Sequence, residues 1–436
     1  MTAWAGTSVT VPSGLRRTSP GGWGAAARCT PTSSWSGCTG AAHATATQIA
    51  RIRTSPRRTA AGAGAVRRGL VLVAAIWVAV ACAAAPAPPP GPPDIAFTPV
   101  ALPDGAVPEV LAADGDQLLV GVHRAAAPQP PGLVRRSPDG TVTEVPAQAV
   151  TGYGRTASWS SLAADGTRIL AIGGDRGGAH GNVRWSVWTG SGSGVAEHAQ
   201  AFSTFGGWGA GDLIDAVLTP GGSAVVGSWE SAEAGLDVAV WTPRGDDWVR
   251  RPSTGTPLQS TRAEVAFPIA ATGFGPGVVV AGWQVGTGAG GGQVPVVWRS
   301  GPDAAGWDKA VLPDAGKAGT AKAIRCANAT CAVAGTADGT LALWRLVDGR
   351  WSRVPGLPPI PVGDADRLAA PLDADGSLTA VVADRGQVKV VEAGEPPSTH
   401  NAAGPTGPVT AAVRVGPSVF VVAGDRLWQA DVAAFH

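Results

Sequence analysis

Short apolar runs recur along the chain, and each contains or ends next to a small residue. The small residues are Gly121, Gly173, Gly227, Gly282, Gly335, Ala383 and Gly424, at intervals of 52, 54, 55, 53, 48 and 41 residues. A strand turns successive side chains to opposite faces, so nearly continuous apolar runs predict strands buried on both faces. We expect the small residues to let neighbouring units approach closely.

Each run is preceded by another strand and a tight turn, as in AADGDQ (112–117) and AADGTR (163–168). Asp-Gly and Gly-Gly pairs supply the positive φ that hairpin turns need. A third strand follows each run and often contains a tryptophan, and a polar turn then leads to a fourth strand. These tryptophans are Trp188, Trp241, Trp298, Trp344 and Trp428.

Four antiparallel strands in each of seven repeats predict an all-β fold, a seven-bladed β-propeller. A six-bladed ring is the alternative if the weakest unit, 360–398, forms no blade. The last unit lacks a fourth strand, and the segment IAFTPVALP (95–103) has no unit of its own. We expect this segment to complete the last blade, because closing the ring removes open sheet edges.

The composition agrees with an all-β fold and argues against a helical one. The 436 residues include 62 glycines and 37 prolines, which disfavour long helices. The 17 tryptophans are more than turns and surface need, so we expect most of them to fill the space between blades.

Charge divides the chain into two unlike parts. Residues 1–81 contain nine arginines and no acidic residue, whereas the rest carries 24 basic and all 32 acidic side chains. The later part is therefore acidic overall, so we expect no nucleic-acid partner.

An apolar run, GLVLVAAIWVAVA (69–81), follows an arginine pair and precedes Cys82. Thirteen residues are too few to span a membrane but suit a signal peptide. The sequence Ala79-Val80-Ala81-Cys82 resembles the lipobox of bacterial lipoproteins, although Ala79 replaces the usual Leu. The resemblance implies cleavage before Cys82, a lipid on its thiol, and a position on the outer face of the cell membrane.

Four segments follow from these patterns. Residues 1–65 are expected to be disordered or to precede the true start, 66–81 form the lipoprotein signal peptide, 82–93 form a Pro-rich tether, and 94–436 form the propeller. We expect the mature protein to be a monomer whose membrane contact is the lipid anchor.

Cys326 and Cys331 bracket the turn CANATC, where other blades use Asp-Gly. No second cysteine pair or nearby histidine completes a zinc site, so we predict a structural disulfide in an exported protein. The histidines are scattered, and we expect no metal and no cofactor.

Loops between second and third strands and loops between blades share one face of a propeller, where ligands usually bind. The former are long in the first four blades: 123–132, 175–182, 229–237 and 284–293. The candidate ligand face consists of Tyr153, Arg155, Trp159, Arg176, Trp208, Asp212, Trp229, Arg262 and Glu264. Aromatic, basic and acidic side chains together suit a glycan, a peptide or a protein.

Two polar turns resemble the Asp-box of sialidase-like propellers: Ser137-Pro138-Asp139-Gly140-Thr141, and Ser300-Gly301-Pro302-Asp303 with Gly306-Trp307. With the lipobox, they make the chain similar to propeller lipoproteins of high-GC Gram-positive bacteria that carry sialidase-like repeats. In that family the box is a fold element away from the active site, so it implies architecture rather than activity.

Three functions remain open from the sequence. The chain is expected to be a binding or scaffold module outside the cell, and we assign no catalytic residues. The first alternative is a sialidase-like glycoside hydrolase that uses Tyr153, the only tyrosine. The second is a structural envelope protein without a small ligand.

Overall fold

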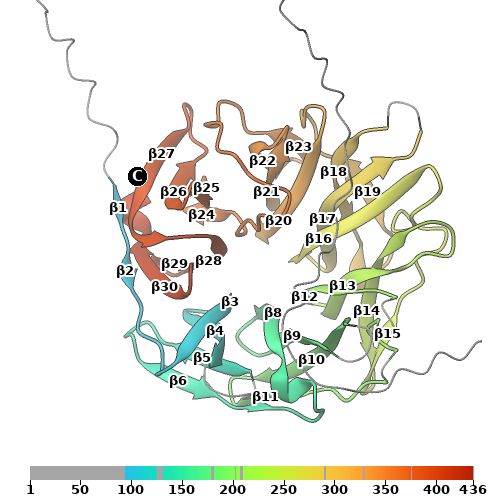
Figure 1. Ribbon diagram of the computed structural model, residues 1–436, viewed down its shortest axis with the longest axis horizontal. Coiled ribbons are helices and arrows are strands. Elements are labelled where there is room, and N and C mark those ends of the chain that lie inside the picture. The colour runs from blue at the N-terminus through green and yellow to red at the C-terminus, as the bar shows by residue number, and fades with distance from the viewer. Residues whose placement is uncertain are drawn as a thin grey trace, which may run out of the picture. The chain divides into compact units, whose positions relative to one another are not determined.

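The computed structural model describes residues 94–435, apart from 125–130, 178–180, 202, 207–209, 289–290, 328 and 375. Cys82, Trp208, the signal peptide and the tether lie outside the described residues. Seven sheets are arranged around a ring. The inner strand of each sheet, nearest the axis, is β3, β8, β12, β16, β20, β24 or β28 (Figure 1). The seven-bladed prediction is therefore confirmed.

The first four blades follow one another along the chain. Blade 1 contains β3 (Ala106–Asp114), β4 (Gln117–Arg124), β5 (Gly132–Arg136) and β6 (Val142–Val145). Blade 2 contains β8 (Ser158–Ala164), β9 (Ile169–Arg176), β10 (Val183–Ser191) and β11 (Gly194–Glu197), with β7 (Ala147–Gln148) on its outer edge. Blade 3 contains β12 (Leu213–Thr219), β13 (Gly222–Glu230), β14 (Leu236–Arg244) and β15 (Asp247–Arg250). Blade 4 contains β16 (Glu264–Phe274), β17 (Gly277–Gly286), β18 (Gln293–Arg299) and β19 (Asp308–Val311).

The last three blades complete the ring. Blade 5 contains β20 (Gly319–Ala327), β21 (Thr330–Ala337), β22 (Thr340–Val347) and β23 (Arg350–Arg353). Blade 6 contains β24 (Leu372–Ala374), β25 (Ser377–Asp384), β26 (Gln387–Glu392) and β27 (Ser398–Thr406), with β1 (Ile95–Ala96) beside β27. Blade 7 contains β28 (Val409–Val415), β29 (Ser418–Ala423) and β30 (Arg426–Asp431), with β2 (Thr98–Pro99) as its outer strand.

The weakest unit does form a blade, so the six-bladed alternative is wrong. Its inner strand β24 has only three residues, and the other three strands pair fully. Two cations of blade 5 hold the segment that precedes β24. Lys322 Nζ donates to the carbonyls of Gly363, Asp364 and Asp366, and Arg325 Nε donates to Pro371 O.

The core is divided into seven clusters, one at each blade–blade interface. Alternate residues of one strand serve different clusters. In β13, Val225 packs towards blade 2, whereas Ala224 and Val226 pack towards blade 4. This alternation explains the continuous apolar runs, since both faces of each second strand are buried.

The tryptophans of the third strands lie in these clusters, as predicted. Trp188, Trp241, Trp298 and Trp344 are at most 1% exposed. In blades 3, 4 and 5 the indole N–H donates to a carbonyl of the preceding inter-blade connection, at Thr204, Pro257 and Pro313. Each of these tryptophans therefore fixes a connecting loop as well as filling the core.

The N-terminal strand closes the ring, as predicted. Thr98 and Pro99 pair antiparallel with β30, and Val100 N donates to Leu427 O. The structure adds a contact that the sequence did not predict, because Ile95 and Ala96 pair in parallel with β27 of blade 6.

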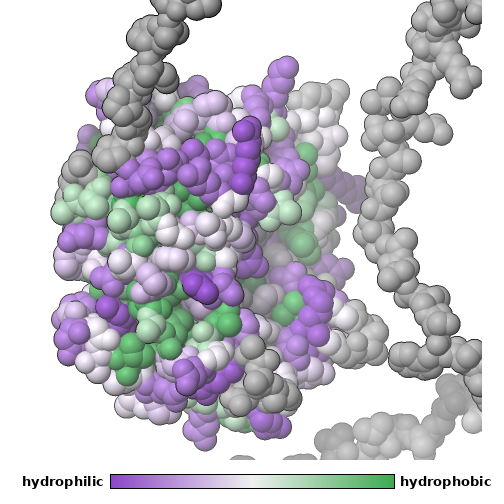
Figure 2. Space-filling view, turned by 60° about the vertical axis from the view of Figure 1, so that its left-hand side comes forward, coloured by the Kyte–Doolittle hydropathy of each residue, from purple (hydrophilic) through white to green (hydrophobic). Residues whose placement is uncertain are grey.

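On this side of the molecule, hydrophobic residues gather in patches between hydrophilic ones (Figure 2).

Candidate functional site

The upper face, as we name it, carries the loops between blades and those between second and third strands. The latter are long in blades 1 to 4 and shrink to two residues each in blades 5, 6 and 7, at 338–339, 385–386 and 424–425. The lopsided face expected from the sequence is therefore present. Long connections gather over blades 1 to 4, where loops can surround a ligand.

Carboxylates pin several of the upper loops. Glu197 accepts hydrogen bonds from the backbone N–H groups of Val150 and Thr151, each at 2.7 Å, and from the Thr151 hydroxyl. A Cβ at Gly154 would lie 2.1 Å from Glu197 Oε2, so only glycine fits beside this carboxylate. The loop that carries Tyr153 is thereby held in one conformation.

Two further carboxylates do the same in other blades. Asp237 is 3% exposed and accepts from Ser253 Oγ at 2.5 Å and from Ser260 N at 2.8 Å. Asp338 accepts from the backbone of Lys317 and Ala318. Loops fixed by carboxylates bonded to backbone and hydroxyl donors form a preorganised surface, which loses little entropy when it binds.

The predicted ligand residues fall into three groups. The first lies between blades 1 and 2. Tyr153 is 40% exposed and Arg155 is exposed, both around the short helix η1 (Gly154–Thr156). Trp159 differs, since it is 4% exposed, packs against Trp188 and donates to Gly132 O. Trp159 therefore belongs to the core, and only Tyr153 and Arg155 of this group are open to a ligand.

The second group lies at the upper end of the interface between blades 2 and 3. Arg176 and Asp212 are exposed, and Trp229 is half-buried against Trp241. The structure adds Trp185, whose indole N–H donates to Asp212 Oδ1 at 3.3 Å. It also adds Arg250, whose guanidinium lies 4.6 Å from the centre of the Trp229 ring.

The third group lies between blades 3 and 4. Arg262 and Glu264 are exposed, and Glu264 pairs with Lys309 at 2.7 Å. The backbone N–H of Arg262 donates to Glu233 Oε1, which joins this loop to the long loop of blade 3. The eight predicted residues that the structure describes therefore do not form one cluster, and in the second group Trp185 and Arg250 contact two of them, Asp212 and Trp229.

Sequence reasoning missed Trp185, Arg250 and a set of polar side chains on the innermost strands. Strand alternation could have found Trp185, because it shares a face with the buried Val187. The inner polar residues had no such signal, since they bond to partners about 50 residues away in other blades. Ser161 Oγ of blade 2 donates to Asp215 Oδ1 of blade 3 at 2.8 Å, and Ala271 N of blade 4 donates to Asp215 Oδ2 at 2.6 Å.

Burial dominates the electrostatics of these inner carboxyls. It raises the pKa of Asp215 to about 6, although the bonds from Ala271 and Ser161 and the nearby Arg367 act in the opposite direction. Burial also raises the pKa of Glu109, against the backbone N–H of Trp159 and the neighbouring His123. His123 Nδ1 lies 2.9 Å from Glu109 Oε1.

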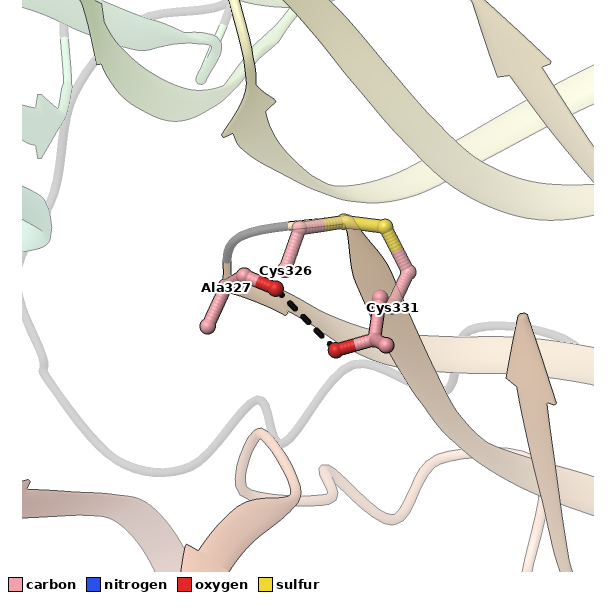
Figure 3. The surroundings of a disulfide bond; sticks show 4 residues. Cys326, Ala327 and Cys331 are labelled. Carbon is pink, nitrogen blue, oxygen red and sulfur yellow. Dashed lines mark hydrogen bonds between the residues drawn. A yellow bond between two sulfur atoms is a disulfide. The ribbon is translucent and has the colours of Figure 1, made fainter. Parts of the chain in front are cut away.

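The cysteine pair lies at the end of the β20–β21 hairpin, on the face opposite the upper loops. Cys326 and Cys331 are directly opposite each other in the ladder, with Sγ atoms 1.94 Å apart (Figure 3). Thr330 Oγ1 donates to Ala327 O across the same turn. The geometry fits the predicted pairing, and oxidation of the pair in the native protein stays a prediction.

No group of three or more His, Cys, Asp or Glu residues in the described part of the chain is placed to hold a metal ion. Within 94–435, outside the gaps given above, no helix has the length and apolar character needed to cross a membrane.

The fold and its upper face define a seven-bladed β-propeller with its long connections on one side. No family model and no curated protein matches the sequence. Among solved structures, the chain is similar to a puromycin hydrolase mutant complexed with PGG, with 15% identity and a TM-score of 0.50 over 78% of this chain and 56% of that one. The chain thus spans just over half the length of that hydrolase.

Two other structures align more weakly. The β-propeller domain of Cps50 (Swd1) from Myceliophteria thermophila has 10% identity and a TM-score of 0.49, over 76% of this chain and 99% of that one. YCF48 bound to D1 peptide has 9% identity and a TM-score of 0.46, over 78% and 97%. At such identities a similarity concerns the fold and carries no activity.

Proposed function

We propose that this chain is an exported, lipid-anchored propeller that acts as a binding or scaffold module outside the cell membrane. Its ligand, a glycan, peptide or protein, binds the upper face. The observation that carries the proposal is the set of upper loops fixed by Glu197, Asp237 and Asp338 around exposed aromatic and charged side chains. Rigid loops that present such residues suit recognition.

The test of the module compares the two faces of the ring. Full-length protein in detergent is screened against envelope glycans and peptides, together with Tyr153→Ala/Arg155→Ala on the upper face and Asp348→Ala on the opposite face. We expect a ligand whose binding is weakened by upper-face substitutions but not by Asp348→Ala. A ligand lost only with Asp348→Ala would contradict the placement of the site on the upper face. No ligand at all would contradict the proposal and favour a structural envelope protein.

The proposed localisation at the membrane rests on the segment before the propeller. An apolar run, Cys82 and the Pro-rich residues 83–93 suit a lipid-anchored monomer held off the outer face of the membrane by a semi-rigid spacer. We expect Cys82→Ser to abolish labelling by an alkyne fatty acid and to remove the protein from the washed membrane fraction. The Cys326→Ser/Cys331→Ser variant is the matched control and should keep the label. Unchanged labelling of Cys82→Ser would exclude this anchor.

A glycoside hydrolase is the second candidate. One observation favours it: the Arg184 guanidinium lies 5.8 Å from the centre of the exposed Tyr153 ring. A sialidase also needs an acid beside its tyrosine, and Glu197 is instead bonded to the loop backbone. A fluorogenic sialoside hydrolysed by the full-length protein but not by Tyr153→Phe would support the hydrolase.

A further inference from the structure

Two tryptophans flank the upper end of the interface between blades 2 and 3. Trp185 on β10 and Trp229 on β13 pack against the same core cluster, and both are half-buried rather than enclosed. Trp188, three positions after Trp185, and Trp241, twelve positions after Trp229, are fully buried. Trp185 and Trp229 therefore anchor in the core and keep part of each indole at the surface.

Asp212 connects the two tryptophans. Its Oδ1 accepts from the Trp185 indole, and its backbone carbonyl accepts from Ser228 N, next to Trp229, at 2.8 Å. Asp212 is nevertheless exposed, and it lies just before β12, the inner strand of blade 3. A carboxylate held by an indole at the surface is an oriented acceptor for an incoming hydroxyl.

Arg250 supplies the complementary donors. Its guanidinium lies over the Trp229 ring, and the residue is exposed. A planar guanidinium stacked on an aromatic ring keeps its N–H groups in its own plane, where they can donate to a ligand. The group of four thus combines the surface part of the Trp185 indole, a guanidinium donor stacked on Trp229 and the Asp212 acceptor, and the charges of Asp212 and Arg250 balance.

From these contacts we infer that Trp185, Asp212, Trp229 and Arg250 form a binding site for a neutral saccharide. The C–H face of a pyranose packs on the part of the Trp185 indole that lies at the surface, because Arg250 already lies over the Trp229 ring. Each sugar hydroxyl is both donor and acceptor, which matches the adjacent Asp212 and Arg250. The balanced charge of these two side chains favours a neutral sugar over an acidic one. This inference deepens the proposed function and rests on it.

The test uses full-length protein in detergent and three probes: mannohexaose, maltohexaose and penta-galacturonate. Binding is measured by calorimetry and by tryptophan fluorescence. We expect a neutral hexasaccharide to bind and to change tryptophan emission, with affinity that varies less than about twofold between low and high salt. We expect Asp212→Asn and Arg250→Gln each to weaken binding by about tenfold, since each replaces charge-assisted hydrogen bonds to the ligand by weaker neutral ones.

Arg136→Gln is the matched control. The Arg136 guanidinium lies 5.4 Å from the centre of the Phe420 ring, a second cation–aromatic pair, between blades 1 and 7. This variant should bind the neutral sugar as the native protein does. Because Asp212 and Arg250 are exposed, their variants should keep the native melting temperature, which separates loss of the site from loss of the fold.

Three outcomes overturn the inference. They are no binding of either neutral sugar, preference for penta-galacturonate, and neutral binding that Asp212→Asn and Arg250→Gln leave unchanged. If the saccharides fail and an upper-face peptide or protein ligand is found by the screen above, the saccharide site is wrong and the binding module stands. If no ligand of any kind binds, the proposed function fails as well.

Discussion

Asp215 links three blades through one side chain. Its two oxygens accept from Ser161 of blade 2 and Ala271 of blade 4, and Asp215 itself belongs to blade 3. The two hydrogen bonds tie the blades together, but they do not compensate for burial. Removal from water disfavours the charged carboxylate more than the two bonds favour it. The balance appears as a pKa raised to about 6.

A raised pKa makes the folded state hold a proton that the unfolded chain has released. Between about pH 4 and pH 6 the folded state binds more protons, so this group makes the free energy of unfolding fall as pH rises. The size of this contribution is about 3 kcal/mol, for a shift of about two pKa units. Asp215→Asn should remove it, and urea unfolding across this pH range should show a flatter profile for the variant.

Asp165 serves as the control, because its pKa is lowered in the folded state whereas that of Asp215 is raised. Partial burial opposes ionisation there, but hydrogen bonds from Arg168 and Thr167 lower its pKa to about 2. Asp165→Asn should leave the fall in stability between pH 4 and pH 6 in place. A native-like slope in Asp215→Asn would show that another group causes it.

At the scale of the strand, the repeating glycines have a different reason from the expected one. Six inner strands carry a β-bulge, and the bulged residues are Glu109, Ser160, Ile214, Ile269, Lys322 and Thr410. Gly227, Gly282 and Gly335 each pair with the residue just before the bulge of the inner strand.

At these three glycines the nearest atom belongs to the same blade. A Cβ at Gly282 or Gly335 would lie 2.2 or 1.9 Å from a carbonyl oxygen of its own inner strand, and a Cβ at Gly227 would lie 2.2 Å from the carbonyl of Asp212, just before that strand. The expectation that small residues serve the approach of neighbouring blades is therefore wrong at these positions. At Gly121 both neighbours are close, because a Cβ there would lie 2.6 Å from Val110 of the same blade and 2.8 Å from Trp159 of blade 2.

The hairpin of β20 and β21 allows a test of the cysteine pair. The cysteines are five residues apart in sequence, so a bond between them closes a short loop and contributes about 2 kcal/mol through the unfolded chain. We expect Cys326→Ser/Cys331→Ser to lower the free energy of unfolding by this amount. Dithiothreitol should lower it equally in the native protein and leave the variant unaffected. A native protein that is indifferent to the reductant would mean that the pair is reduced or contributes nothing.

At the scale of the whole molecule, we expect stability to depend on joining the first strands of the propeller to its last blade. Phe97 lies between β1 and β2, is 5% exposed, and contacts Phe435 edge to face at 6.2 Å between ring centres. Its backbone N–H donates to Ala403 of blade 6. One residue from the N-terminal side thus contacts both blades 6 and 7.

Phe97→Ala should lower the free energy of unfolding by about 3 kcal/mol, because it leaves a cavity at the closure. Thermal unfolding would show this loss, and limited proteolysis should cut first near residues 94–103. Val347→Ala, at a position 46% exposed, is the control and should change little. Equal melting temperatures for both variants would mean that the closure contributes little to stability.

The sequence by itself determined the repeat, the strand order within a blade, the ring closure and the buried tryptophans. These follow from local periodicity, from turn residues with positive φ and from the rule that apolar runs are buried. Tertiary structure decided which residues meet across blades. Asp215 bonds Ser161 and Ala271, each more than 50 positions away, and Arg250 covers Trp229.

Only the fold could separate Trp159 in the core from Trp229 at the surface, since both are tryptophans near the upper ends of strands. The exposure of each indole depends on which residues of the neighbouring blade lie beside it, and the periodicity of a strand does not reveal those residues. The bulges in the inner strands likewise arise from the pairing of two strands.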